Sequence, residues 1–373
     1  MRILMIAMSS YWQWMAGNVN RNQAIWNAMI ADRDVNSLIF VGYVPYTVRR
    51  MIKDRLMEKK YRQYTRIKKT FFFSCFRIHE KCLMIQPRWM WRNPRAFQKK
   101  LIRFIATLSM QDADFDCVWS YNPIFPWQRM STERLVFDAV DNWAVHPAWR
   151  RCAREILAGY QMIEKTYDVI FTVSQTLKST LFGNHPKTYW IGNGVDTRLF
   201  TGIAASHPKT KTPSVVYSGI IQQRVDVELM IQCAQALPDV VLYIAGPIWR
   251  GVDVSGLQKQ PNIHLLGFVP YQQLPILLSE SWVGIIPHIV DPLTSSMNPM
   301  KLYEYMASEL PVVTTALPDI PKSPYIIVAL SRDEFVSALR RFTQHQPVRA
   351  QYDMQEYDWQ SRYGAMKQHL GFI

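Results

Sequence analysis

The sequence lacks any apolar run of about 18 residues, the length that a membrane-spanning helix needs. Residues 1–8 are apolar, but this run is too short for a signal-peptide core and fits a buried strand instead. The five cysteines are odd in number and no two have Cys-x-x-Cys spacing, so neither a disulfide framework nor a zinc site is indicated. A reducing compartment fits this cysteine usage. Internal repeats and low-complexity tracts are also missing.

Acidic residues are scarce in one segment. The net charge of +14 comes from 43 Lys and Arg against 29 Asp and Glu, and residues 49–103 alone hold 18 Lys and Arg against 3 Asp and Glu. This basic insertion also contains Tyr61, Tyr64, Phe71, Phe72, Phe73, Phe76, Trp89, Trp91 and Phe97. Basic residues interspersed with aromatic residues predict contact with an anionic membrane surface. The alternative is a helical insertion with buried aromatics and solvated charges; nucleic acid is not expected, because no nucleic-acid motif accompanies the charge.

Short apolar runs alternate with amphipathic segments along the chain. The runs at 2–8, 36–41, 117–120, 135–140 and 169–173 predict one set of strands, and those at 214–217, 240–245, 262–266, 283–286 and 311–314 predict a second. Such alternation is typical of parallel α/β sheets. We therefore predict an α/β fold of two Rossmann-like, doubly wound domains that face a cleft. The expected boundaries are 1–200, a linker at 201–213, 214–352, and a last helix at 353–373 that crosses back to the first domain.

Two stretches in the second half carry the most specific signal. They are residues 191–200 (IGNGVDTRLF) and residues 298–308 (NPMKLYEYMAS), which lead into the Pro-Val-Val of 311–313. Weaker pieces follow in matching order, at 171–178, 217–219, 244–247 and 266–271. Together they resemble the GT-B glycosyltransferases of family 4. The motif is closest to the branch of the xanthan glucuronosyltransferase and the teichuronic-acid glycosyltransferases.

The resemblance implies transfer of a sugar from a nucleotide diphosphate donor, with UDP favoured over GDP and no metal cofactor. A diphosphate needs a cation and backbone N–H groups at a helix start, which Lys301 and the following helix can supply. In the family the glutamate that matches Glu304 binds the nucleotide ribose. The further donor-binding positions are Gly219, Arg224, Pro287, Asn298 and Leu302. The plain alternatives are a surface lysine, a solvated glutamate, and an ion pair of Arg224 with Asp226. The Asn193-Gly194 turn is expected to be structural.

One departure from the family bears on the mechanism. The usual motif has a first glutamate seven positions before Glu304, where this chain has Met297. Because many retaining members use that glutamate, we predict an inverting enzyme, which needs a general base. Asp141, at the end of the strand at 135–140, is the candidate base, with a turn-capping role as its alternative and His146 as a second candidate base. Asp138 is expected to be a buried hydrogen-bond partner.

The acceptor is expected to contact Asn18, Arg21, Tyr121 and Asn122, which follow two strands of the first domain. An ordinary ion pair is the alternative for Arg21. The Asp-x-Asp pairs at 112–116 precede a strand, so we interpret them as a solvated loop without a metal.

The predicted function is glycosyl transfer to a lipid-linked saccharide in capsule, exopolysaccharide or cell-wall polymer synthesis. The protein would act in the cytoplasm, on the inner face of the plasma membrane. The alternatives are a retaining transferase, a nucleotide-sugar epimerase of the same fold, and a non-catalytic membrane- or polyanion-binding protein.

Overall fold

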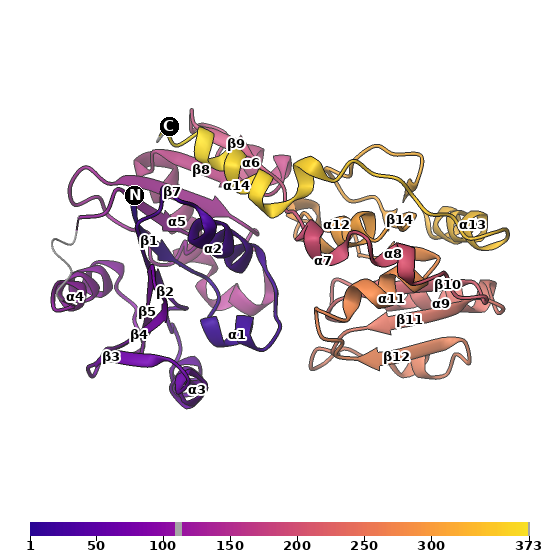
Figure 1. The fold of residues 1–373 in the computed structure, drawn as a ribbon, viewed down its shortest axis with the longest axis horizontal. Coiled ribbons are helices and arrows are strands. Elements are labelled where there is room, and N and C mark those ends of the chain that lie inside the picture. The colour runs from indigo at the N-terminus through magenta and orange to yellow at the C-terminus, as the bar shows by residue number, and fades with distance from the viewer. Residues whose placement is uncertain (109–113, 372–373) are drawn as a thin grey trace. The chain divides into compact units, whose positions relative to one another are not determined.

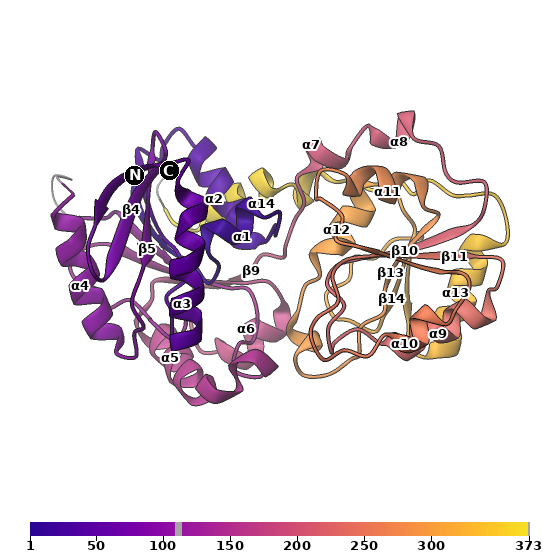
Figure 2. The same cartoon turned by 90° about the horizontal axis from the view of Figure 1, so that it is seen from below.

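The computed structural model describes residues 1–108 and 114–371, without the side chains of Lys60 and Tyr61. The chain forms two compact units (Figures 1 and 2). Unit 1 comprises residues 1–191 and 363–373, and unit 2 comprises residues 192–362. Within the described residues, no helix combines the length and the apolar character needed to cross a bilayer.

Unit 1 is built on a nine-stranded sheet in the order β3-β4-β5-β2-β1-β6-β7-β8-β9. Seven strands are parallel: β1 (Arg2–Ile6), β2 (Ser37–Val41), β5 (Cys82–Pro87), β6 (Cys117–Ser120), β7 (Arg134–Ala139), β8 (Val169–Thr172) and β9 (Thr188–Trp190). Its helices are α1 (Tyr11–Met15), α2 (Arg21–Ala31), α3 (Val48–Met57), α4 (Pro94–Ala106), α5 (Ala153–Thr166), α6 (Gln175–Leu181) and most of α14 (Trp359–Gln368). The central strands are buried along their length, as near-continuous apolar runs predict for parallel strands covered on both faces.

The basic insertion is helical at its two ends, in α3 and α4, but not throughout, as the alternative of a helical segment with buried aromatics would have it. Between α3 and α4 it adds β3 (Thr65–Lys69) and β4 (Phe73–His79), which pair antiparallel at the edge of the sheet, with β5 next to them. Several of its aromatic side chains are core residues: Phe73, Phe76, Trp91 and Phe97 are at most 7% exposed. The expectation that these rings are exposed is therefore wrong, because the first four residues of β4 are all buried, and Trp91 and Phe97 pack with Phe73 in the core of unit 1. Phe71 and Trp89 remain exposed.

Unit 2 is built on a six-stranded, fully parallel sheet in the order β12-β11-β10-β13-β14-β15. The strands are β10 (Ser214–Ser218), β11 (Val241–Ala245), β12 (Ile263–Gly267), β13 (Val283–Ile286), β14 (Val312–Thr315) and β15 (Ile326–Ala329). The helices are α7 (Thr197–Phe200), α8 (Ile203–Ser206), α9 (Val227–Ala236), α10 (Ser255–Gln258), α11 (Leu274–Glu280), α12 (Met300–Ala307) and α13 (Arg332–Thr343).

Two separate apolar cores show that the sheet of unit 2 is doubly wound. Val215 packs in one core with residues of α9 and α13, whereas the next residue, Val216, packs in the other core with residues of α11 and α12. Successive side chains of a strand point to opposite faces, so helices cover both faces of this sheet. The predicted doubly wound α/β architecture is confirmed.

The boundary between the units differs from the expected one. It lies after Ile191 and not after residue 200, and Asn193 and Val195 hydrogen-bond to Asn298 and Tyr357 within unit 2. The expected linker at 201–213 packs on unit 2, where Lys209 Nζ donates to the Ser281 carbonyl at 2.6 Å. At the other end, Tyr363–Ile373 belongs to unit 1.

The last turns of α14 are held in unit 1 by polar contacts. The hydroxyl of Tyr363 donates to Asp32 at 3.0 Å, and Lys367 Nζ lies 2.9 Å from the same carboxylate. His369, just after the helix, stacks on Tyr189 with ring centroids 3.6 Å apart. These contacts join the end of the chain to its first half.

Candidate functional site

The topology of unit 2 creates a crevice at the carboxyl ends of β10 and β13. These two strands are neighbours in the sheet, but the chain leaves β10 toward β11 on one side and leaves β13 toward β14 on the other side. Such a switch point is where doubly wound sheets bind ligands, because the two connecting loops diverge there. Gly219 directly follows β10 and His288 follows β13. Helix α12 brings Lys301 to the same place, as three contacts show.

Lys301 lies in the first turn of α12 and is not an ordinary surface lysine. Its Nζ lies 4.2 Å from the centroid of the Tyr217 ring and 3.4 Å from Nε2 of His288. It is also within van der Waals distance of Gly219, where an added Cβ would lie 3.1 Å from Nζ. Within the described residues, no carboxylate oxygen lies within 4.0 Å of this ammonium. The site therefore holds a cation without a neutralising anion.

Burial changes the protonation of the two charged residues of α12. Burial, together with the charge of Arg224, lowers the pKa of Lys301 to about 7, against the opposing effect of Glu304. Burial raises the pKa of Glu304 to about 7, against the opposing effects of Lys301 and the Tyr271 hydroxyl. Glu304 is only 7% exposed, so the alternative of a solvated helix glutamate is wrong. A half-buried lysine and a buried glutamate with shifted pKa values, one helical turn apart, are typical of a ligand site.

His288 belongs to this site, although the sequence analysis did not select it. The side chain is 2% exposed, and burial together with Lys301 and Arg224 lowers its pKa well below 6.5, so the ring is neutral. When Lys301 is charged its ammonium can only donate, so Nε2 then accepts from Lys301 and the neutral ring carries its proton on Nδ1. Nδ1 has no hydrogen-bond partner in the described part of the chain. A buried N–H donor without an acceptor suits an anionic ligand.

The neighbouring predicted donor residues have structural contacts. Asn298 Oδ1 accepts from the Asn193 N–H at 2.7 Å, and Asn193 Nδ2 donates to the Asn298 carbonyl at 2.6 Å. This reciprocal pair gives Asn193 the structural role that the sequence favoured, and it fixes the loop before α12. Pro287 accepts from the Asp226 N–H through its carbonyl at 2.7 Å, and Leu302 is a fully buried core residue.

Arg224 does not form the ion pair that the sequence offered as its alternative. Asp226 pairs with Arg332 at 3.0 Å, and it also accepts from the Leu229 N–H at the start of α9. Arg224 instead places Nη1 3.4 Å from the sulfur of Met297. Because Arg224 lowers the pKa values of Lys301 and His288, its positive charge is felt at the same crevice. Three potential anion ligands thus share one place in unit 2.

In unit 1, Asp141 follows β7 at the carboxyl end of the sheet. It is 8% exposed, and its Oδ1 accepts from the Asn142 N–H at 2.9 Å. The Asp141 carbonyl accepts from the buried Tyr160 hydroxyl at 3.1 Å, which fixes the backbone at this point. His146, the second candidate base, caps a 3₁₀ helix, with Nδ1 accepting from the Ala148 N–H. The role of Asp141 or His146 as the general base stays a prediction.

The expected acceptor residues of unit 1 are mostly buried. Arg21 is 2% exposed, and its Nε donates to both oxygens of Asp138 at 3.0 and 2.9 Å. This is the ion pair left open as the alternative for Arg21, and it confirms Asp138 as a buried hydrogen-bond partner. Tyr121 is fully buried, so its ring offers no wall to an acceptor. Asn122 Oδ1 shapes the turn after β6, where it accepts from the N–H groups of residues 124 and 125. Asn18 is exposed.

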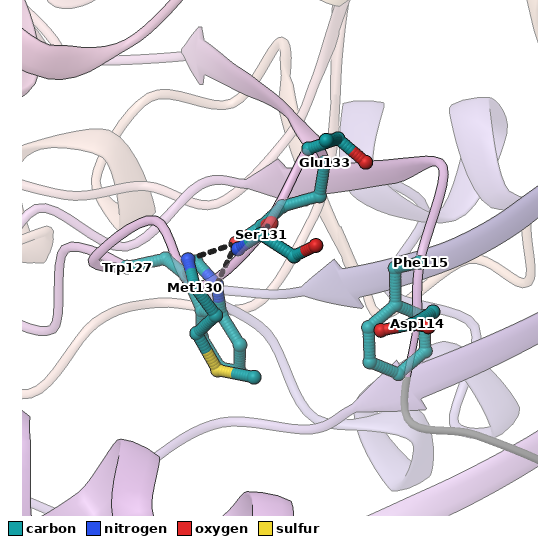
Figure 3. A pocket seen from close by; sticks show the side chains of 7 residues that line it. Asp114, Phe115, Trp127, Met130, Ser131 and Glu133 are labelled. Atoms are coloured by element: carbon teal, nitrogen blue, oxygen red, sulfur yellow. Dashed lines mark hydrogen bonds between the residues drawn. The ribbon is translucent and has the colours of Figure 1, made fainter.

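A small hollow in unit 1 lies apart from these residues. It is lined by Asp114, Phe115, Trp127, Met130, Ser131, Thr132 and Glu133 (Figure 3). The Glu133 carboxylate accepts from the N–H groups of Met130 and Ser131 at 2.6 and 2.7 Å, so it is occupied by the protein itself. Of the Asp-x-Asp residues, Asp116 accepts from the Arg2 N–H, and Asp112 lies outside the described residues. Among the residues that the structure describes, no three His, Cys, Asp or Glu side chains form a metal site.

Comparison with known proteins gives matches to both halves. Residues 212–345 match the family model described as "Glycosyl transferases group 1". A Bacillus subtilis (strain 168) protein assigned as the teichuronic acid biosynthesis glycosyltransferase TuaH is 23% identical over 249 residues. That match covers 60% of this chain and 63% of the relative, so it spans less than two thirds of the relative's length.

Solved structures with the same fold cover nearly the whole chain. A sucrose-phosphate synthase from Thermosynechococcus elongatus has a TM-score of 0.65 at 13% identity, covering 99% of this chain and 96% of its own. Anabaena Alr3699/HepE in complex with UDP and glucose has a TM-score of 0.63 at 13% identity, covering 100% and 99%. An E. coli trehalose-6-phosphate structure bound with UDP-2-fluoro glucose has a TM-score of 0.64 at 12% identity, covering 100% and 99%. The sequence and fold matches confirm the resemblance to GT-B proteins of the family 4 type.

Proposed function

We propose that this chain, whose residues 212–345 form a glycosyl transferase group 1 domain in a GT-B fold, transfers a sugar from a nucleotide diphosphate donor to a saccharide acceptor. The observation that carries the proposal is the ammonium of Lys301. It lies at the switch point of unit 2, against Gly219 and His288, with no carboxylate within 4.0 Å in the described residues. A diphosphate supplies the missing negative charge.

Each donor residue has a role in this proposal. Lys301 and Arg224 hold the diphosphate and stabilise the charge that develops on it as the sugar leaves. His288 donates its Nδ1 proton to the same group, and Gly219 lets the backbone approach it without a side chain. Glu304 accepts hydrogen bonds from the ribose hydroxyls. A uridine donor is supported by the UDP and UDP-2-fluoro glucose named for two neighbours of the same fold.

Transfer with inversion fits the residues of this chain. Met297 stands where retaining relatives carry a glutamate, and its sulfur faces Arg224. In the proposed step the acceptor oxygen bonds to the anomeric carbon while the bond from that carbon to the β-phosphate oxygen breaks. The hydroxyl proton passes to Asp141, and the nucleoside diphosphate leaves on Lys301 and Arg224. No metal is required for this charge balance.

A lipid-linked saccharide is the proposed acceptor, in the synthesis of a capsule, exopolysaccharide or cell-wall polymer. The support is the similarity to a protein assigned to teichuronic acid biosynthesis. The strongly basic segment of unit 1 also suits a substrate that is carried on an anionic membrane.

The test is a panel of radiolabelled donors, UDP-glucose, UDP-glucuronic acid and GDP-mannose, each with and without membrane lipids from a polymer-producing bacterium. Transfer of label to a lipid from a UDP-sugar supports the proposal, and NMR of the product gives its anomeric configuration. Conversion of the donor sugar without acceptor would instead indicate an epimerase. Retention of configuration would overturn the assignment of Asp141 as the base.

A further inference from the structure

Helix α3 turns its apolar residues outward. Val48, Ile52 and Leu56 are 53%, 50% and 59% exposed, and their spacing of four residues places them in one line along the helix. The opposite side of the helix holds Asp54, which is 2% exposed and accepts from Arg50 Nε at 2.9 Å. An ordinary surface helix buries its apolar line and exposes its acids. This arrangement is the reverse.

The apolar surface continues from α3 onto the neighbouring strand connections. Phe71 and Trp89 are 58% and 36% exposed, and their ring centroids lie 4.7 Å apart. The guanidinium of Arg55, on α3, lies 5.9 Å from the Phe71 ring and 5.6 Å from the Trp89 ring. Arg55 Nε also donates to the Arg88 carbonyl at 2.8 Å. We call Val48, Ile52, Leu56, Phe71 and Trp89 the apolar stripe; Figures 1 and 2 show the position of α3 in unit 1.

Exposed positive charge flanks the apolar stripe, and the one exposed acid of the insertion, Glu80, lies in the turn between β4 and β5. Arg49 and Lys53 are exposed on α3 directly beside the stripe, and Lys59, Arg62 and Arg66 are exposed in the segment that follows. Two of the three acidic residues of the insertion are engaged inside unit 1. Asp54 pairs with Arg50, and Glu58 pairs with Arg88 at 3.0 Å. The surface therefore combines apolar side chains with uncompensated cations.

We infer that the apolar stripe and the basic residues that flank it dock unit 1 on an anionic lipid surface. The exposed rings and aliphatic side chains would enter the headgroup region, while the Lys and Arg heads contact lipid phosphates from their flexible stems. A nucleic acid or other soluble polyanion would contact the basic residues but leave the three aliphatic side chains of α3 in water. The inference depends on the proposed function only for the purpose of docking. A lipid-linked acceptor would lie in the same lipid surface on which unit 1 docks.

The test is co-sedimentation of the full chain with vesicles of phosphatidylcholine alone or with 30% phosphatidylglycerol added. The stripe variant carries Val48→Ser, Ile52→Ser and Leu56→Ser, and a charge variant carries Arg49→Glu and Lys53→Glu. The matched control carries Leu157→Ser, Ile276→Ser and Leu330→Ser, which are also exposed apolar positions. Circular dichroism and thermal unfolding check that every variant is folded, and UDP binding is measured separately by calorimetry.

The expected result is at least about tenfold stronger partition of the wild type to the anionic vesicles than to the neutral ones. The stripe and charge variants should each lose about tenfold or more, and the control should lose nothing. Unchanged binding of the stripe variant would overturn the inference, as would wild type that binds UDP but no vesicle. If the wild type binds no vesicle but forms a dimer, and the stripe variant is monomeric, the surface serves self-association instead. Vesicle binding without UDP binding would leave the inference standing and remove the proposed function.

Discussion

Lys301 ends directly against the backbone of Gly219, so a Cβ built on that glycine would lie 3.1 Å from Nζ and 3.2 Å from Cε. Gly219 has φ of +132°, a conformation that favours glycine, and its N–H is fixed by the Ala245 carbonyl at 2.8 Å. The loop after β10 and the first turn of α12 are therefore fitted to each other. The ammonium position depends on the absence of a side chain at residue 219.

Gly219→Ala should weaken nucleoside diphosphate binding by about tenfold or more, because the new methyl group displaces the ammonium from the crevice. The backbone strain should also lower the free energy of unfolding by about 1–3 kcal/mol. Gly251→Ala is the control, since Gly251 has φ of +90° and no atom within 4 Å of its added Cβ. That variant should lose stability but keep its affinity for UDP. Equal affinities of the two variants in a calorimetric titration would contradict this account.

Binding of UDP should take up a proton above pH 7. Burial lowers the pKa of unliganded Lys301 to about 7, whereas a bound diphosphate stabilises the charged form. As pH rises from 7 to 8.5, Lys301 is increasingly neutral before binding, so the affinity should fall by up to about tenfold per pH unit. Calorimetry in two buffers of different ionisation enthalpy measures the uptake. Lys301→Met should abolish it, and Lys209→Met should not, although burial also lowers the pKa of Lys209 to about 7.

His288→Phe should weaken UDP binding by about tenfold, because the ring then has no N–H to donate to the diphosphate. It should also shift the midpoint of the pH dependence, since Nε2 no longer contacts Lys301. His264→Phe is the matched control, with an exposed ring that packs beside Tyr243. If the two variants bind UDP equally well, His288 has no part in the donor site.

Asp141→Asn should reduce kcat by about a hundredfold to ten-thousandfold with little change in UDP affinity, because the amide cannot accept the acceptor proton. The hydrogen bond from the Asn142 N–H to Oδ1 can persist, so the fold should be retained. A variant with normal kcat would show that Asp141 only shapes its turn.

The control for that prediction is Asp138→Asn, three residues away. Asp138 is fully buried against Arg21, so removing its charge should cost about 3–5 kcal/mol of unfolding free energy. Thermal unfolding separates this structural loss from a loss of catalysis. An unchanged melting temperature for Asp138→Asn would contradict the assignment of the ion pair as a structural element.

The sequence predicts the central strands well and the basic insertion poorly. The runs at 117–120 and 283–286 have the bounds that the sequence indicates, because short continuous apolar runs are typical of buried parallel strands. The edge strand β3 was missed because Lys and Arg interrupt its pattern, and β4 was missed because its first four residues are all buried and show no alternation. Their pairing depends on contacts with β5, which local pattern does not encode.

The candidate site was predictable where a motif spans it. Lys301 and Glu304 stand in one contiguous stretch, so resemblance alone selects them. His288 is a single histidine after a strand. It lies close to Lys301 only because β10 and β13 are adjacent in the sheet. The burial of Arg21 against Asp138, 117 positions away in the chain, likewise arises from tertiary packing.

The most direct test of the central claim is calorimetric titration of the full chain with UDP and GDP. The account predicts saturable binding of UDP that Lys301→Met weakens by about a hundredfold, as loss of a charge-assisted contact of about 1.5–3 kcal/mol allows. Lys322→Ala, at an exposed lysine of the same unit, should bind as the wild type does. Absence of binding by the folded wild type, or equal affinities of wild type and Lys301→Met, would contradict the account.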